Sequence, residues 1–293
     1  MALSIMNNSS SLSIQNQLNR TNGALGTALE RLGSGLRINS AKDDAAGLQI
    51  ANRLTAQSTG QKAALYNSNS AMTMMQTADS AFDEMTNIAD RMKELATQAA
   101  NGTNSSAEYT AMNSEYQDLG AELQSIIANT SYGSGTSLLD TTNGKFGSGS
   151  ITFQVGASTS ETLDVDVSTE IGTINTAIGT GGTYAGTALA WDTDSATTQG
   201  NAQDAMDEID TLISNIGSAR SSLGASMNRL DHTINNVTNM KEATDSAASN
   251  LMDADYAEET SAMTKQQLLM NSGVSVLSVS NSTNQMIASL LQG

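Results

Sequence analysis

The sequence predicts a mainly α-helical protein, in which long coiled-coil-like helices from both chain ends form an elongated bundle with a small β-hairpin region. Three observations support this fold class. Apolar residues recur every seventh position over residues 202–251, with others three or four positions on, which is typical of a helix with one buried seam. The chain contains no Pro, a residue that costs about 3 kcal/mol inside a helix. Its residues are 38% hydrophobic and only 3% aromatic, so alanine and methionine supply much of the apolar surface, as in thin bundles.

The longest predicted helix covers residues 202–251. At a rise of about 1.5 Å per residue it would form a rod of roughly 75 Å, which needs partners of similar length. The alternative is two shorter helices broken near Gly217 or Gly224, but neither glycine shifts the heptad phase. The predicted core residues of this rod are Ile209, Ile216, Leu223, Leu230, Val237 and Leu251, with Thr244 as a polar member of the same series.

Both ends of the chain carry narrower heptad seams. Serine or threonine occupies some positions of each seam, so we expect these helices to be stable only against a partner. Gly35 lies at the predicted end of the first helix, and Ser40, or Asp43 with Asp44, is suited to cap the next one. The seam residues are Ile14, Leu18, Leu25 and Leu32 near the N-terminus, and Leu269, Val276, Val279, Met286 and Leu290 near the C-terminus.

Two further helical segments, residues 48–101 and 107–128, are predicted to pack with the rod as one antiparallel bundle. The first carries an apolar stripe at helical spacing, and such a stripe is more often a helix core than a ligand-binding surface. The break between the two segments falls at residues 101–104, which contain a glycine and two asparagines. The stripe consists of Met75, Ala78, Phe82, Met85, Ile88, Met92, Leu95 and Ala99.

The helical period disappears between residues 129 and 200, where Gly, Ser and Thr dominate. Apolar and polar residues alternate on both sides of a short polar loop, which predicts a β-hairpin. Residues 171–178 are expected to form one or two helical turns, and residues 179–195 a short, surface-exposed insertion. The alternating apolar residues are Ile151, Phe153 and Val155 before the loop, and Leu163, Val165 and Val167 after it.

Composition and motifs argue against several classes of function. The formal net charge of −17 disfavours binding to nucleic acid or to anionic lipid. The absence of Cys excludes disulfides and thiolate chemistry. The lone histidine, His232, is more readily explained as a solvated helix residue than as a catalytic group, and the pairs Asp43/Asp44 and Asp253/Asp255 as helix caps. We therefore expect no enzyme activity, no metal and no cofactor.

No apolar run approaches the roughly 18 residues needed to span a membrane, and no basic region followed by an apolar one precedes residue 22, so neither a membrane span nor a cleavable secretion signal is expected.

Residues 24–32 (ALGTALERL) and 34–47 (SGLRINSAKDDAAG) closely resemble the N-terminal signature of bacterial flagellins. Residues 253–260 (DADYAEET), then 263–269 (MTKQQLL), resemble the C-terminal one. The resemblance implies an inner-tube domain of helices from residues 1–42 and 254–293. It also implies an outer-tube domain from residues 43–178 and 196–253, with residues 179–195 as a variable insertion.

The resemblance further implies a subunit that self-assembles into the extracellular flagellar filament for motility, after export in unfolded form by the flagellar type III apparatus. The implied partners are other copies of the chain, an export chaperone, and the cap and hook-junction proteins. Flagellins sensed by the vertebrate flagellin-sensing Toll-like receptor present an Arg, a Leu and a Glu, which correspond here to Arg91, Leu95 and Glu115.

Three other functions compete with this interpretation. A hook–filament junction protein of the same superfamily would share the helical ends and would differ in its low copy number on filaments. A secreted hydrolase on the same scaffold would need a metalloprotease motif such as His-Glu-x-x-His, which the sequence lacks. A free helical adhesin would stay monomeric under assembly conditions.

Overall fold

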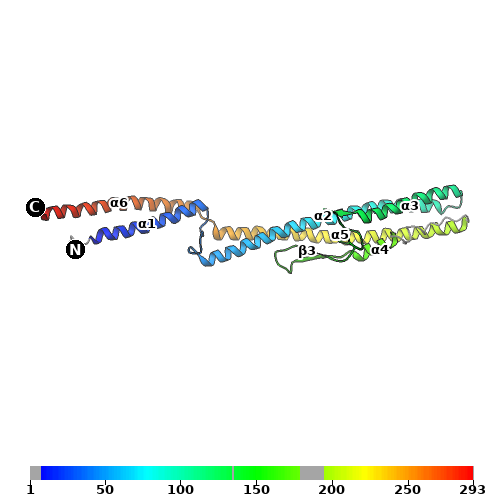
Figure 1. The fold of residues 1–293 in the computed structure, drawn as a ribbon, viewed down its shortest axis with the longest axis horizontal. Helices are drawn as coiled ribbons and strands as arrows, with labels where there is room; N and C mark the ends of the chain where they lie inside the picture. The colour runs from blue at the N-terminus through cyan, green and yellow to red at the C-terminus, as the bar shows by residue number, and fades with distance from the viewer. Residues whose placement is uncertain (1–7, 134, 179–194, 293) are drawn as a thin grey trace. The chain divides into compact units, whose positions relative to one another are not determined.

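A computed structural model describes residues 8–133, 135–178 and 195–292, without the side chains of residues 195–199, 284 and 287–292 (Figure 1). This part of the chain contains six helices and four short strands. The helices are α1 (Ser9–Ser34), α2 (Ala45–Ala99), α3 (Ser106–Asn129), α4 (Ser168–Ile178), α5 (Ser195–Met252) and α6 (Tyr256–Gln292). The strands are β1 (Ser131–Tyr132), β2 (Thr136–Ser137), β3 (Ile151–Gln154) and β4 (Thr162–Val165).

The predicted fold class is confirmed. The long helix is continuous, since α5 passes through Gly217 and Gly224 without a break. Both chain ends are helical, as α1 and α6. The predicted surface insertion at residues 179–195 lies outside the described residues except for Ser195, which begins α5.

The chain divides into two compact units. We name Met1–Ser58 with Glu242–Gly293 the terminal unit and Thr59–Lys241 the central unit. Both α2 and α5 contribute residues to each unit. The division into inner-tube and outer-tube domains, with boundaries near residues 42 and 254, stays a prediction.

The central unit has one main hydrophobic core, formed by α2, α3, α4, α5 and the hairpin β3–β4. All eight residues of the stripe predicted on residues 75–99 are buried. The predicted rod residues Ile209, Ile216, Leu223 and Leu230 are fully buried, and Val237 is buried at the end of this unit. Two ion-pair groups tie α2 to α5 at the surface, Arg220 with Asp79 and Asp83 at 3.0 and 2.8 Å, and Lys93 with Asp210.

The predicted hairpin is confirmed as β3 and β4, an antiparallel pair in which Phe153 lies opposite Leu163. Its buried side chains include Leu163 and Val165, which extend the core. The hairpin lies against α2, where Asn67 Nδ2 donates to the Gln154 carbonyl at 3.3 Å.

Residues 130–133 and 135–148 belong to a folded loop that the sequence pattern does not predict. The two-residue strands β1 and β2 pair antiparallel there. Leu138, Leu139 and Phe146 are fully buried and join the main core. The loop is closed by the Gly144 N–H, which donates to the Asp140 carbonyl at 2.7 Å. Strands of two residues are too short to show an alternating pattern, which is why this part of the core was missed.

Part of the buried face of α2 carries polar or small side chains. Gln61 and Ser68 are 2% and 1% exposed, and neither the Gln61 amide nor the Ser68 hydroxyl has a hydrogen-bond partner within the described chain. Their neighbours on this face, Ala64 and Ala71, are also buried. This stretch therefore offers much less apolar contact area than residues 75–95 of the same helix.

In the terminal unit, α1 and α6 pack along each other (Figure 1). The helix α1 ends where Gly35 takes a left-handed conformation with φ 75°, and its N–H donates to the Arg31 carbonyl at 2.8 Å. Arg31 also binds Glu259 of α6 at 2.9 Å. A Cβ on Gly273 of α6 would lie 2.7 Å from Leu18 Cδ2, so this glycine permits the close approach of the two helices. Of the predicted rod residues, Leu251 belongs to this unit and is half-buried.

Candidate assembly and recognition surfaces

Four of the predicted C-terminal seam residues form an exposed apolar surface, which we call the α6 stripe: Leu269, Val276, Val279 and Met286. They are 45%, 53%, 64% and 59% exposed. The side chain of the fifth, Leu290, lies outside the described residues. An apolar stripe with this much exposed surface is a feature of interaction surfaces.

The α6 stripe is not the face that packs most closely on α1. The less exposed positions of α6 are Gln266, Met270, Gly273, Leu277 and Ser280, which also follow a heptad spacing. Met270, Leu277 and Ser280 each lie one residue after a predicted seam position, which corresponds to a rotation of about 100° around the helix. The helix therefore has two adjacent seams, one for α1 and one open to solvent.

The predicted N-terminal seam does face α6. Ile14, Leu18, Leu25 and Leu32 are half-buried, and Thr21 and Ala28 between them are buried.

A groove of about 240 Å³ runs between α1 and α6. Its α1 side includes Ile14 and Leu18, and its α6 side includes Leu269, Gly273 and Val276. The α6 stripe is therefore continuous with a half-open apolar groove, and the two together make one larger apolar surface.

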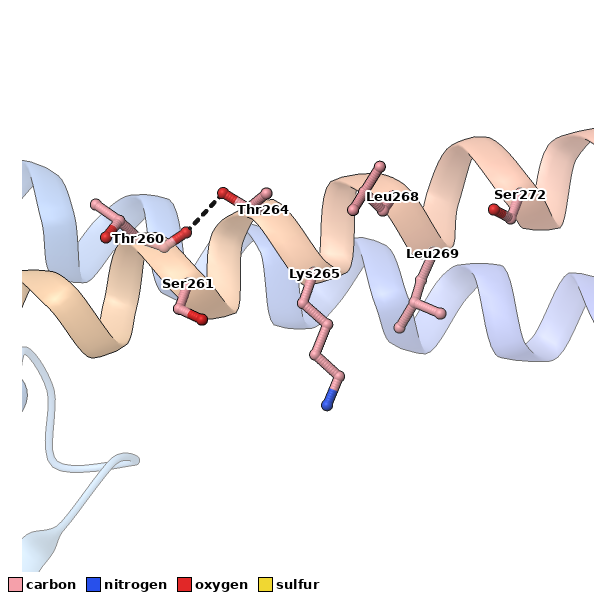
Figure 2. Close-up of a pocket in the computed structure, with 7 residues that line it drawn as sticks. All are labelled: Thr260, Ser261, Thr264, Lys265, Leu268, Leu269 and Ser272. Carbon is pink, nitrogen blue, oxygen red and sulfur yellow. Dashed lines mark hydrogen bonds between the residues drawn. The ribbon is translucent and has the colours of Figure 1, made fainter.

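A second hollow lies on α6 alone, as Figure 2 shows. Lys265 extends from it and forms no ion pair within the described chain, and Leu268 beside it is 62% exposed. The Thr264 hydroxyl is used inside the helix, where it donates to the Thr260 carbonyl at 2.8 Å. The hollow lacks convergent polar groups that could fix a small molecule.

Arg91 lies at the centre of an exposed charged cluster on the central unit. Its Nη2 and Nε atoms bind Glu115 Oε1 of α3 at 2.7 and 2.9 Å, and its Nη1 binds Glu94 Oε2 at 2.5 Å. Hydrogen bonds to Glu115, and then to Glu94, raise the pKa of Arg91. The cluster fixes the position of Glu115 relative to Arg91 across two helices.

Leu95 does not belong to that surface. It is 3% exposed and packs in the main core, so its side chain is not presented to a partner. Of the three residues expected from the resemblance, only Arg91 and Glu115 are therefore exposed, and their role in recognition stays a prediction. The reason for the burial of Leu95 is the helical period, which places position 95 on the same buried face as Met92.

The segment with the strongest resemblance, residues 34–47, is a tight cap. Asp43 Oδ2 accepts hydrogen bonds from the Ser40 hydroxyl and from the N–H groups of Ser40 and Asn39, which lowers the pKa of Asp43. Asp44 Oδ1 accepts from the Gly47 N–H at 2.8 Å. A Cβ on Gly47 would lie 2.5 Å from Asp44 Oδ2, so a larger residue at this position in the first turn of α2 would displace the Asp44 side chain.

A pH effect follows from a similar cap on α3. The N–H of Ser105, and then its hydroxyl, donate to the Glu108 carboxylate, which lowers the pKa of Glu108. A depressed folded pKa gives stability that is present above the unfolded pKa of about 4.3 and lost as pH falls through the folded pKa. We expect Glu108→Gln, which keeps a capping acceptor but cannot titrate, to lose less melting temperature on acidification than the unmodified chain. Equal losses in thermal melting curves would contradict the effect.

No group of three or more His, Asp or Glu side chains in the described residues could hold a metal ion, and no helix there is long and apolar enough to cross a membrane. His232 is exposed on α5. Asp255 caps α6 by accepting from the Ala257 N–H at 2.8 Å.

Comparison with known proteins gives two family matches. The model described as “Bacterial flagellin N-terminal helical region” matches residues 5–144, and that described as “Bacterial flagellin C-terminal helical region” matches residues 206–291. A flagellin of Listeria innocua is 36% identical over 285 residues, which cover 96% of each chain. Flagellin A of Vibrio anguillarum is 33% identical over an alignment of 386 positions, which covers 100% of each chain.

Among solved structures, a Bacillus cereus flagellin matches with 32% identity and a TM-score of 0.46, over 61% of this chain and 94% of that one. A putative flagellar hook-associated protein from Vibrio parahaemolyticus matches with 14% identity and a TM-score of 0.56, over 72% and 100%, which shows a likeness of fold alone.

Proposed function

The chain belongs to the bacterial flagellin family, whose members are structural subunits of the extracellular flagellar filament, and on that premise we propose that it polymerises through its α1–α6 region. The observation that carries this proposal is the α6 stripe, whose four apolar side chains are 45–64% exposed in the part of the chain that the structure describes. A contact between this surface and a different surface of the next copy is heterologous, and heterologous contacts that do not close into a ring give open helical filaments. Residues 1–42 and 254–293 would then form the inner layer of the filament.

Reassembly of purified protein tests this proposal. The protein is dissociated in acid, returned to neutral pH and viewed by electron microscopy. Long helical filaments support polymerisation by the chain alone, whereas persistent monomers would contradict it. Counting copies in sheared filaments separates this function from that of a junction protein, which would be scarce.

We also propose that the chain leaves the cell unfolded through the flagellar type III apparatus, with an export chaperone and the cap and hook-junction proteins as partners. Its lack of Cys supports this route, because no disulfide would have to be reduced before threading. The protein should appear outside cells that have the apparatus and remain inside cells that lack it.

A further proposal concerns the Arg91 cluster, as a contact surface for the vertebrate flagellin-sensing Toll-like receptor. Both Arg91 and Glu115 are exposed, and their ion pair at 2.7 Å presents a positive and a negative group at a fixed spacing. Such charge pairs favour a partner with complementary charges.

We expect Arg91→Ala combined with Glu115→Ala to lower receptor signalling by monomer at least tenfold, which corresponds to about 1.4 kcal/mol of binding free energy. Folding should be nearly unchanged, since exposed ion pairs contribute only about 0–1 kcal/mol. Signalling is read in a reporter cell line, and circular dichroism checks the fold.

Arg220→Ala is a matched control, because Arg220 is also a surface arginine of this unit with two acidic partners. It should leave signalling intact. Full signalling by the double variant, or an equal loss in the control, would refute the proposed surface.

A further inference from the structure

The chain contains three Asn-Gly dipeptides, at Asn22, Asn101 and Asn143. In such a pair the glycine lacks a Cβ that would hinder its backbone nitrogen from reaching the asparagine side-chain carbonyl carbon. All three asparagine side chains are exposed. The three sites therefore do not differ in the exposure of the asparagine. They differ in whether the N–H of the following glycine donates a hydrogen bond.

Two of the three glycine nitrogens are engaged. Gly23 lies inside α1, where each N–H donates to the carbonyl four residues earlier. The Gly144 N–H donates to the Asp140 carbonyl at 2.7 Å, and Gly144 is buried. Reaction at either site requires local opening first, and the free energy of opening adds to the barrier.

The third site is open. Asn101 and Gly102 lie in the turn between α2 and α3, both are exposed, and the Gly102 N–H donates no hydrogen bond within the described chain. Asn101 Oδ1 accepts from the Thr103 N–H at 3.3 Å, which folds the side chain over the Gly102 peptide. The same donor stabilises negative charge that develops on Oδ1 during attack at Cγ.

We propose that Asn101 is a site of spontaneous deamidation. The Gly102 nitrogen forms a bond to Asn101 Cγ and loses its proton to solvent, while the Cγ–Nδ2 bond breaks and ammonia leaves with a proton. Water then opens the five-membered succinimide at either carbonyl, to give an aspartyl or an isoaspartyl residue. The net change consumes one water, releases ammonia and adds one negative charge.

The isoaspartyl product also lengthens the main chain by one carbon in this turn. Tyr109 Oη donates to the Asn101 carbonyl at 3.0 Å, and the Ser105–Glu108 capping box lies just beyond. Aged protein therefore differs from fresh protein in charge and in the geometry of the α2–α3 connection.

The test follows all three sites in one molecule. Full-length protein is incubated in warm, mildly alkaline buffer, and peptide mapping by mass spectrometry with isoaspartyl methyl-labelling gives the three rates. In folded protein, Asn101 should convert at least about tenfold faster than Asn22 and Asn143, equivalent to about 1.4 kcal/mol of barrier. In guanidinium chloride the three rates should converge, because the opening cost is gone.

Gly102→Ala is the informative variant. Gly102 is not among the glycines with positive φ, so its backbone accepts alanine without strain. The added methyl group should slow conversion of Asn101 severalfold or more and leave the other two sites unchanged. Equal native rates at Asn143 or Asn22, absence of conversion at Asn101, or an unaffected rate in Gly102→Ala would each overturn the proposal.

Discussion

Replacing Leu223 by aspartate is expected to unfold most of the central unit. Leu223 is fully buried in the main core on α5. The lost side-chain burial is worth about 1.5–3 kcal/mol. The new carboxyl group must also be desolvated without a partner, which costs several kcal/mol more whether it stays charged or takes up a proton. The total approaches the 5–15 kcal/mol that stabilises a typical domain.

Thermal and urea unfolding followed by circular dichroism would measure this loss. Ala225→Asp is the matched control, since position 225 is exposed on the same helix two residues away. Surface substitutions of this kind usually change stability by less than about 0.5 kcal/mol. A melting transition of Leu223→Asp equal to that of the control would show that position 223 carries no core contact.

Val279→Asp is expected to abolish filament formation while the monomer stays folded. Val279 is 64% exposed, so the monomer loses little burial, and Val and Asp have similar helix propensities. In a filament the same contact recurs in every subunit. A charge placed in an apolar contact costs several kcal/mol each time, which lowers subunit affinity by orders of magnitude.

Electron microscopy after neutral reassembly gives the outcome, and melting curves verify the monomer. Ser278→Asp adds the same charge to the same helix, about 100° away and outside the α6 stripe. Filaments from the Ser278 variant but not from the Val279 variant support the stripe as the contact. If both variants fail, added charge anywhere on α6 is sufficient, and if both assemble, the stripe is not an interface.

The long helices could be predicted because their signal is repeated many times. In α5 the apolar residues keep the same heptad register over six heptads. A single glycine such as Gly217 is therefore weak evidence for a break in the helix. The hairpin β3–β4 was equally predictable, because alternation on both sides of a polar loop leaves one pairing in which apolar residues share a face. The folded loop that contains β1 and β2 has no such repetition. Its shape depends on close backbone contacts around Gly144, and such contacts leave no periodic pattern of apolar residues in the sequence.

The surfaces were harder to predict than the core. In α6 two neighbouring stripes both follow a heptad spacing, and only the packing of α1 shows which one the chain covers itself. Leu95 received two incompatible assignments, one from the core stripe and one from the family resemblance. The structure places it in the core, because the local helical period fixes its direction whatever its relatives present.

The polar stretch of α2 around Gln61 and Ser68 makes the central unit mechanically uneven. A buried polar group without a partner costs about 1–3 kcal/mol, while residues 75–95 hold the other half of the helix with Met and Phe side chains. A force that pulls on α2 where it enters the central unit, at residue 59, therefore acts first on the weakest contacts, those around Gln61 and Ser68. We expect the helix to separate from that end first, and the contacts of residues 75–95 to break last. In this order the contacts of α2 break a few at a time, so the force needed at any moment is smaller than the force that would break the whole core at once.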